Sequence, residues 1–591
     1  MDREFKDILK EAKNDNFDAQ LRVAEKYEKD GKYKDAFHWY LELANEADQP
    51  SSQVKVANYY FEGKAVKQDY SKACYWYSKA AEFGNAEAIS KLAYMYKEGL
   101  GAEQNKEEAF SLYSKAASLG DIDAKYNLGV MYRNAVGTEK DDSKSFYWFS
   151  EAANEGHGNA KVNLGYCYCN GIGTRQNAEK GFSLYEEMAN ENNIKAMFNL
   201  GMCYNNGYGT EKNVAKAIEC FEEAGKNGHG RAFYELGVIY ESEGEFKKNL
   251  GFVIDCYQRA VTNGYLKAAI KLSKLYFVKG EEKKALQWLE KGAEDEEVMF
   301  SLAKYYFDGE FITQNYTRAL KYFSEAAKKD YPLAQYYMGL AYFNGYGVAE
   351  DEERAIECLK ISAENNCIEA IVLLSDIYCE KELEETNVLL KKAAELGDVN
   401  SMYELGYNYA HGKLIEKDLS KAVYWYKKAA DLNNAQAQCN LALCYLKGQG
   451  IDRDLGFGVY WLERAVSNNS AVAALNLGSC YEDGIGVEKN DYMAIKYYLK
   501  AANQDNYRAQ LAVARMYKNS DVNQAIYWYN KAMVKSYDDA CLGLVDIYLK
   551  DNLVDQNQIR MMLDNIDDKD ATIYLEMEEK YKKYIEERAA I

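Results

Sequence analysis

A fixed stride runs along the 591 residues of this chain and constrains its fold more than any other feature. A residue that is usually small is followed three positions later by tyrosine, and this pair recurs sixteen times. The first residues of the pairs are Ala24, Ala57, Ala93, Gly129, Gly165, Gly201, Gly237, Ser273, Ala303, Gly339, Ser375, Gly406, Ala442, Gly478, Ala514 and Val545. Eleven of the fifteen steps measure 36 residues, and the others measure 33, 30, 31 and 31. A period of roughly 20 to 50 residues is typical of a solenoid, in which each repeat buries its apolar face against its neighbours.

Residues 122–157 show how one repeat is built. Ala124, Leu128 and Met131 follow the spacing of one helix face. Gly129 lies beside that face, and a glycine inside a helix costs about 1 kcal/mol against alanine. Its recurrence therefore predicts that a second helix approaches closely at this point. A polar turn follows, and then a second apolar face of large aromatic residues and paired alanines, so each repeat is predicted to be a helix-turn-helix hairpin.

The chain as a whole is predicted to be all-α, an α/α right-handed superhelical solenoid of about sixteen helix-turn-helix repeats. Only two prolines occur in it, which suits a chain that is almost entirely helical. We expect a capping helix in residues 1–15, the repeats in residues 16–563 and a second capping helix in residues 564–591. The terminal repeats of solenoids need a polar outer face, which favours capping over a docking role for these helices.

Net charge narrows the classes of partner. A formal charge of −20 disfavours nucleic acid and anionic lipid, and it favours a basic partner segment. The sequence shows no secretory signal and no apolar run long enough to span a membrane, so we expect a cytoplasmic protein without membrane insertion. The thirteen cysteines follow helical positions and are predicted to be core-filling thiols in a reducing compartment.

Chemistry-bearing motifs are scarce. His157 and His229 occupy the same turn between repeats, and we expect both to face solvent without a carboxylate partner. Cys167 and Cys169 are one residue too close for a zinc knuckle, and the sequence offers no second Cys or His pair to complete a zinc site. The Gly-x-Gly turns lack the preceding strand and the lysine-serine ending of a phosphate-binding loop. The sequence therefore predicts no catalytic residue, no metal site and no cofactor, and a protein that is not an enzyme.

The repeats resemble Sel1-like repeats, which are longer relatives of tetratricopeptide repeats. The resemblance rests on the Leu-Gly and Tyr positions of residues 124–132, on the Lys-Ala, Trp-Tyr and Lys-Ala-Ala block of residues 72–81, and on a double-glycine loop. That loop occurs at Gly99/Gly101, Gly171/Gly173, Gly207/Gly209, Gly345/Gly347, Gly448/Gly450 and Gly484/Gly486. Members of this family are generally assembly factors, signalling adaptors, enzyme activators or bacterial host-interaction factors.

The tetratricopeptide arrangement implies a concave groove lined mainly by the first helix of each hairpin. The aromatic candidates for binding in the groove lie three positions before the small residue: Tyr126, Phe198, Tyr234, Phe300, Tyr336 and Tyr403. The amide candidates lie five positions after the small residue: Asn134, Asn170, Asn206 and Asn344. The alternative is that the aromatic residues pack between helices and that the asparagines end helices. A further series, Asn127, Asn163, Asn199, Asn440 and Asn476, is interpreted as structural and bonded to a neighbouring loop.

The resemblance thus implies a scaffold or adaptor that binds partner proteins, or a basic or extended peptide, in this groove. The alternatives are a secreted host-interaction effector, an enzyme-activating subunit, self-association, and, as a remote third class, a hydrolase with its site in the groove.

Helices and loops of a solenoid differ in their tolerance of insertions. Two residues inserted in the helix around Trp148 rotate its apolar face by more than half a turn, whereas two residues inserted at Thr138 lengthen a loop. We expect the first variant to lose its cooperative thermal unfolding and the second to keep it. Similar melting curves for both variants, followed by circular dichroism, would contradict the hairpin assignment.

Overall fold

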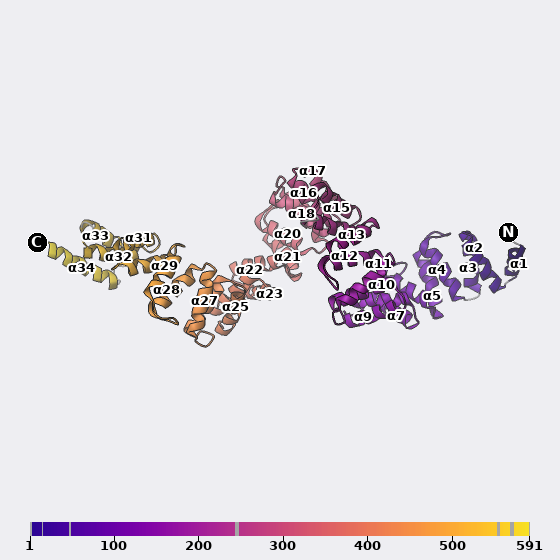
Figure 1. Ribbon diagram of the computed structural model, residues 1–591, viewed down its shortest axis with the longest axis horizontal. Helices are drawn as coiled ribbons and strands as arrows, with labels where there is room; N and C mark the ends of the chain where they lie inside the picture. Colours follow the sequence, from indigo (N-terminus) through magenta and orange to yellow (C-terminus); the bar gives the residue numbers. More distant parts are fainter. Residues whose placement is uncertain are drawn as a thin grey trace. The chain divides into compact units, whose positions relative to one another are not determined.

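The computed structural model describes residues 3–14, 16–46, 49–242, 247–551, 556–567 and 572–589. Within these ranges the chain forms α-helices joined by turns and contains no β-strand, which confirms the predicted all-α class. The chain divides into two compact units, Met1–Val298 and Met299–Ile591, here named the N-terminal and the C-terminal unit. The sequence shows no change of composition at this division, and helical hairpins occur on both sides of it (Figure 1).

The helices of the N-terminal unit follow one another with short turns. They are α1 (Arg3–Ala12), α2 (Phe17–Lys29), α3 (Tyr33–Glu46), α4 (Pro50–Glu62), α5 (Tyr70–Glu82), α6 (Ala86–Glu98), α7 (Lys106–Ser118), α8 (Ile122–Asn134), α9 (Asp142–Asn154), α10 (Gly158–Asn170), α11 (Ala178–Asn190), α12 (Ile194–Asn206), α13 (Val214–Lys226), α14 (Gly230–Ser242), α15 (Leu250–Thr262), α16 (Ala268–Val278) and α17 (Glu282–Gly292). The division between the two units falls inside the next helix, α18 (Glu296–Asp308).

The C-terminal unit continues the same alternation. Its helices after α18 are α19 (Tyr316–Ala327), α20 (Pro332–Asn344), α21 (Glu352–Glu364), α22 (Ile368–Glu380), α23 (Glu385–Glu395), α24 (Val399–His411), α25 (Leu419–Asp431), α26 (Ala435–Lys447), α27 (Leu455–Ser467), α28 (Ala471–Asp483), α29 (Asp491–Ala502), α30 (Tyr507–Tyr517), α31 (Val522–Ala532), α32 (Tyr537–Asp551), α33 (Gln556–Asp564) and α34 (Thr572–Ala589). From α2 to α33 the described helices form consecutive hairpins with an even-numbered first helix and an odd-numbered second helix, which confirms the tandem helix-turn-helix repeats.

Helix boundaries follow from capping chemistry. Most repeats place Asn or Asp before the second helix, as at Asp141, whose side chain accepts a hydrogen bond of 2.9 Å from the backbone N–H of Lys144. Asn177 caps α11 in the same way, with a bond of 3.0 Å from Lys180. The first helix ends on a residue in the left-handed region, such as Gly171 with φ of 68°. These two signals fix where each helix of the hairpin begins and ends.

The recurring small residue marks the point where the two helices of a hairpin touch. A Cβ atom on Gly129 would lie 2.6 Å from Cδ1 of Phe149, and one on Gly165 would lie 2.8 Å from Cε1 of Tyr185. The same pairing joins Gly201 to Phe221, Gly237 to Tyr257, Gly406 to Tyr426 and Gly478 to Tyr498. The missing side chain is therefore filled by an aromatic ring of the second helix, which confirms the predicted close approach.

The second glycine of the double-glycine loop, and Gly137 at the same position of the Ala-Val-Gly loop after α8, have a different role. A side chain on Gly137 would overlap the carbonyl oxygen of Lys106, the first residue of α7, and one on Gly173 would overlap that of Asp142 in α9. The loops that carry this glycine thus rest on the beginning of the second helix of the preceding hairpin. Sequence reasoning identified this glycine as a family marker without predicting the contact.

Both terminal helices pack on their neighbouring hairpin. The ring of Phe5 in α1 lies 5.5 Å from that of Tyr27, and Ala12 is fully buried. In α34, Met577 is buried, and the Nζ atom of Lys580 lies 2.9 Å from a carboxylate oxygen of Asp546 in α32.

All thirteen cysteines are free thiols, and eight of them are buried. Of the helices in the described ranges, none is both long and apolar enough to cross a membrane.

The glycine–ring contact generates a stability prediction. Replacing Gly129 by alanine forces Cβ against Phe149 and should destabilise the protein by about 1–3 kcal/mol, the usual cost of overpacking a core. The matched control is Gly158→Ala in α10, where a Cβ would lie 3.7 Å from Sδ of Met188, an ordinary contact. Urea unfolding should show a lower midpoint for the first variant alone. Equal midpoints would refute this explanation of the stride.

Candidate functional site

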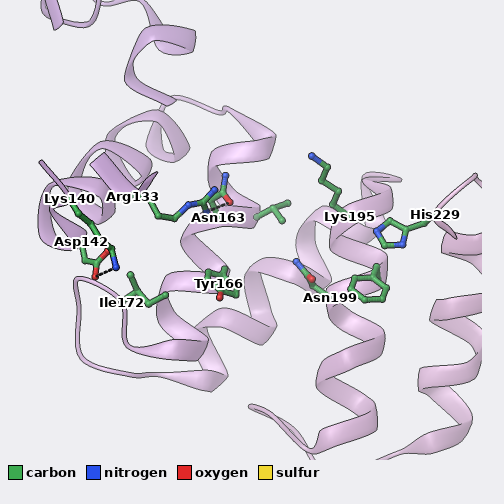
Figure 2. A pocket seen from close by; sticks show the side chains of 11 residues that line it. Arg133, Lys140, Asp142, Asn163, Tyr166, Ile172, Lys195, Asn199 and His229 are labelled. Atoms are coloured by element: carbon green, nitrogen blue, oxygen red, sulfur yellow. Dashed lines mark hydrogen bonds and ion pairs between the residues drawn. The ribbon is translucent and has the colours of Figure 1, made fainter. Parts of the chain in front are cut away.

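The first helices α8, α10 and α12 of the N-terminal unit border a cavity of about 570 Å³ (Figure 2). Side chains from these helices, from the loops that follow two of them and from the turn before α14 line it. The lining residues are Arg133, Lys140, Asp142, Val162, Asn163, Tyr166, Ile172, Lys195, Phe198, Asn199 and His229. This cavity is the first candidate site of the molecule.

An aromatic stack supports one end of the cavity. Phe198 is 7% exposed, and its ring lies 4.4 Å from the ring of His229 at an interplanar angle of 20°. Its other face lies 5.7 Å from the ring of Phe221, which sits on Gly201. Phe198, a predicted groove residue, therefore lines the cavity and also belongs to the packing between helices.

The same stack recurs two repeats earlier and corrects the prediction for the histidines. The ring of His157 lies 4.5 Å from that of Tyr126, and its Nδ1 accepts a hydrogen bond of 3.0 Å from the backbone N–H of Ala160. Its Nε2 lies 3.4 Å from a carboxylate oxygen of Asp123, and the side chain is 14% exposed. The prediction of solvent-facing histidines without a carboxylate partner was wrong here, because the turn folds the ring back to cap α10.

His229 differs from His157 in its electrostatic surroundings. Burial, followed by the positive charges of Arg231 and Lys195, lowers the pKa of the His229 imidazole. Its Nδ1 atom is buried and has no hydrogen-bond partner in the part of the chain that the structure describes. The imidazole is therefore neutral at pH 7 and lies against two cations.

Cationic and amide side chains form the polar part of the cavity. Nη1 of Arg133 in α8 donates a hydrogen bond of 3.0 Å to Oδ1 of Asn163 in α10, the first helix of the next repeat. The Arg133 guanidinium also lies 5.5 Å from the ring centroid of Phe149, which holds it at the edge of the cavity. Lys140 lies 3.4 Å from Asp142, the single carboxylate in the lining. Figure 2 shows these groups together with Asn199 and Lys195.

The remaining aromatic candidates occupy the same structural position as Phe198. Tyr126, Tyr234, Phe300 and Tyr403 each lie on a first helix against an aromatic ring of the second helix. The centroid distances are 6.0 Å for Tyr126 and Phe149, 5.7 Å for Tyr234 and Tyr257, 5.6 Å for Phe300 and Phe323, and 6.2 Å for Tyr403 and Tyr426. Tyr336 lines a second cavity, in the C-terminal unit. The alternative of inter-helix packing thus describes a large part of what these side chains do.

The two asparagine series lie differently from what the sequence predicted. The predicted ligands Asn134, Asn170, Asn206 and Asn344 are the exposed last residues of their helices and do not line either cavity. Nδ2 of Asn170 donates to the Tyr166 carbonyl at 2.9 Å, and Nδ2 of Asn344 donates to the Leu340 carbonyl at 3.0 Å.

The series that the sequence indicated as structural supplies the amides of the cavity, Asn163 and Asn199. The expected bond to a neighbouring loop is wrong for three members of the series, of which Asn476 donates from Nδ2 to Sγ of Cys439 in α26 at 3.6 Å. Asn127 donates to the Asp123 carbonyl of its own helix at 2.9 Å, and Asn163 accepts from Arg133 of another helix. Sequence reasoning also missed Arg133 and Lys195, because neither belongs to a periodic series.

The second cavity, of about 830 Å³, lies in the C-terminal unit and is more apolar and acidic. Its lining comes from the beginnings of α20 and α22, from the turn between α21 and α22, and from the turn before α24. The residues are Tyr331, Pro332, Leu333, Tyr336, Asn365, Asn366, Cys367, Ile368, Glu369, Val372, Leu373, Asp376 and Asp398. Three carboxylates and no cation line it, which is the opposite charge balance to that of the first cavity.

A search of the described ranges finds no group of three or more His, Cys, Asp or Glu side chains that could hold a metal ion.

Tandem hairpins with these loops define a helical-repeat protein. The chain belongs to the Sel1 repeat family, and Sel1 repeats are commonly used for protein–protein interaction. The family model matches residues 50–85, 86–121, 122–157, 158–193, 194–229, 267–296, 297–331, 332–367, 380–398, 399–434, 435–470, 471–506 and 508–532. The N-terminal-unit cavity lies within the matched repeats.

Solved structures similar to this chain include a protective antigen of uropathogenic Escherichia coli with an SLR fold. The two chains are 22% identical, the match covers 83% of this chain and 96% of the antigen, and the TM-score is 0.36. A Sel1 repeat protein from Oxalobacter formigenes is 26% identical and covers 41% of this chain and 99% of its own, with a TM-score of 0.38. The immunity protein Pa5087 from Pseudomonas aeruginosa is 20% identical and covers 36% of this chain and 82% of its own, with a TM-score of 0.26. None of the curated proteins compared with the chain matches it.

The surroundings of His229 generate a titration prediction. Its pKa in the folded protein should lie below about 6.5, the ordinary value of a histidine. The folded state therefore loses stability as pH falls below that value, since the unfolded chain binds the proton more readily. Replacing Lys195 by methionine removes one positive charge and should raise the pKa of His229, measured by NMR titration. The control Lys115→Met, on α7 outside the cavity, should leave it unchanged, and equal shifts in both variants would contradict the assignment.

Proposed function

We propose that the protein is a non-catalytic scaffold or adaptor that binds partner proteins or extended peptides along the inner face of its first helices. The observation that carries this proposal is the N-terminal-unit cavity, where side chains of three successive first helices meet beside an aromatic stack. Sites for peptides combine an apolar surface with a few placed polar groups, and this cavity has both. The family assignment supports the same class of function.

The amides of the cavity suit the backbone of an extended segment. Asn163 and Asn199 occupy the same position of α10 and α12, one repeat apart, and each amide offers two donors and one acceptor oxygen. Tyr166, which is 45% exposed, and Phe198 supply apolar surface beside them. A bound segment would thus satisfy its backbone on the amides and rest its side chains on the rings.

The C-terminal-unit cavity supports the expectation of a basic partner. Glu369, Asp376 and Asp398 lie around an apolar surface that includes Leu333 and Val372. A segment with basic and apolar side chains complements this lining. The proposal therefore includes a second, separate binding region in that unit.

Further parts of the proposal concern the setting of the protein. We propose a cytoplasmic protein, supported by the thirteen free thiols. Helices α1 and α34 are proposed to cap the ends of the array, supported by their packing on the adjacent hairpins.

The test uses a displayed library of random peptides and the full-length protein. Peptides selected on the wild type should bind the double variant Asn163→Ala/Asn199→Ala about thirtyfold more weakly, because each lost hydrogen bond costs about 1 kcal/mol. The matched control is Asn170→Ala, which removes an amide of the same helix α10 outside the cavity.

Circular dichroism melts must show that the variants remain folded. Loss of binding in the control alone would instead favour the amide series that the sequence predicted. Unchanged binding in all variants would refute the N-terminal-unit cavity as the binding site.

A further inference from the structure

We propose that the N-terminal-unit cavity selects an acidic segment of its partner, although the chain as a whole carries a charge of −20. This inference rests on the proposed function and names the chemistry of the segment. It opposes the expectation from net charge, which favours a basic partner everywhere on the surface.

The charge balance of the lining supports this choice. Arg133, Lys140 and Lys195 are cationic, and the single carboxylate, Asp142, is paired with Lys140. In the described part of the chain, Lys195 has neither an ion pair nor a hydrogen bond from its side chain. Two cations of the cavity, Lys195 and Arg133, are therefore not neutralised by any carboxylate of the protein that the structure describes.

Two of the three first helices that border the cavity contribute no negative charge. Neither α10 nor α12 contains Asp or Glu, although 93 of the 591 residues of the chain are acidic. The position that holds Asp123 in α8 holds Asn159 in α10, Lys195 in α12 and Arg231 in α14. The sign of the charge along this row thus changes from negative to positive across the cavity.

Arg231 extends the positive surface at the His229 end. Its guanidinium lies 5.3 Å from the ring centroid of Phe198. Its Nε lies 3.3 Å from a carboxylate oxygen of Glu235, which neutralises part of its charge. Besides burial, the positive charges of Arg231 and Lys195 disfavour protonation of the neutral His229 imidazole. A bound anion would reduce this repulsion.

Arg133 is positioned for a carboxylate. Its guanidinium is fixed by the Asn163 amide and the Phe149 ring, so that little side-chain freedom is lost when a further acceptor binds. A segment that places one carboxylate at Lys195 and another at Arg133 would cross Asn163 and Asn199 on the way.

A short acidic peptide fits this site better than a nucleic acid does. The net charge of −20 makes the surface outside the cavity acidic on average, and this surface repels the parts of a long polyanion that extend beyond the cavity. A segment with a few carboxylates carries only the charge that the cavity can neutralise.

The test uses three fluorescein-labelled peptides of ten residues and fluorescence anisotropy with the full chain. The peptides share one phenylalanine and five alanines and differ at four positions, which are all Glu, all Gln or all Lys. We expect the Glu peptide to bind the wild type at least about tenfold more tightly than the Gln peptide, since charge-assisted bonds contribute more than neutral ones. Added NaCl should weaken this preference.

Charge reversal at one residue separates the cavity from the overall charge. Lys195→Glu should lose the preference for the Glu peptide, and Lys195→Arg should keep it. The matched control Lys115→Glu changes the net charge equally on α7, outside the cavity, and should bind like the wild type.

Several outcomes would overturn the inference: equal binding of the Glu and Gln peptides, equal losses in Lys195→Glu and Lys115→Glu, or displacement of the Glu peptide by a ten-nucleotide single-stranded DNA. If neutral or basic peptides bind instead and depend on Asn199, the acidic specificity fails while the proposed function stands. If no peptide shows binding that depends on a cavity residue, both fail. Binding that coincides with an increase in mass by light scattering would identify a second copy of this chain as the occupant and would also overturn the inference.

Discussion

The contact between a small residue of the first helix and a side chain of the second helix, an aromatic ring at six of the glycines, underlies the rest of the structure. In the hairpin of α8 and α9, the ring of Phe149 occupies the volume that a side chain at Gly129 would take. Four of these rings are also touched by an aromatic residue three positions before the glycine, as Tyr126 touches Phe149. The ring therefore joins the two helices and the inner face in one packed layer, and the stride of the sequence repeats this layer along each unit.

This packing decides which side chains remain for binding. The aromatic candidates lie with one face in the layer and contribute only an edge to the inner surface, as Phe198 does at 7% exposure. Polar side chains one position later, Asn163 and Asn199, are not needed for the contact between helices. The repeat thus supplies a constant apolar support, and single substitutions such as Lys195 give one region a charge that the preceding repeat, with Asn159 at this position, does not have.

The sequence predicted the structural features that recur from repeat to repeat, and it did not predict the features that occur at one place in the chain. Periodic glycine, tyrosine and Asn/Asp caps were sufficient to derive the hairpins, their boundaries and the close approach at Gly129, because local packing and capping act within one repeat. The cavity depends on how successive hairpins are rotated against one another, and a single sequence does not show that rotation. For this reason the sequence did not indicate that Arg133 and Lys195 line the cavity or that Asn134, Asn170, Asn206 and Asn344 lie outside it, and His157 was expected in solvent rather than in a cap stacked on Tyr126.

The loop glycines give the array a direction. Gly137 of one hairpin rests on the first residue of α7 in the hairpin before it, and Gly173 rests on the first residue of α9 in the same way. Removing hairpins from the C-terminal end leaves every remaining loop supported, whereas removing them from the N-terminal end deprives the new first loop of its support. A ribosome makes the chain in the favourable order, so each emerging loop finds its contact surface already folded.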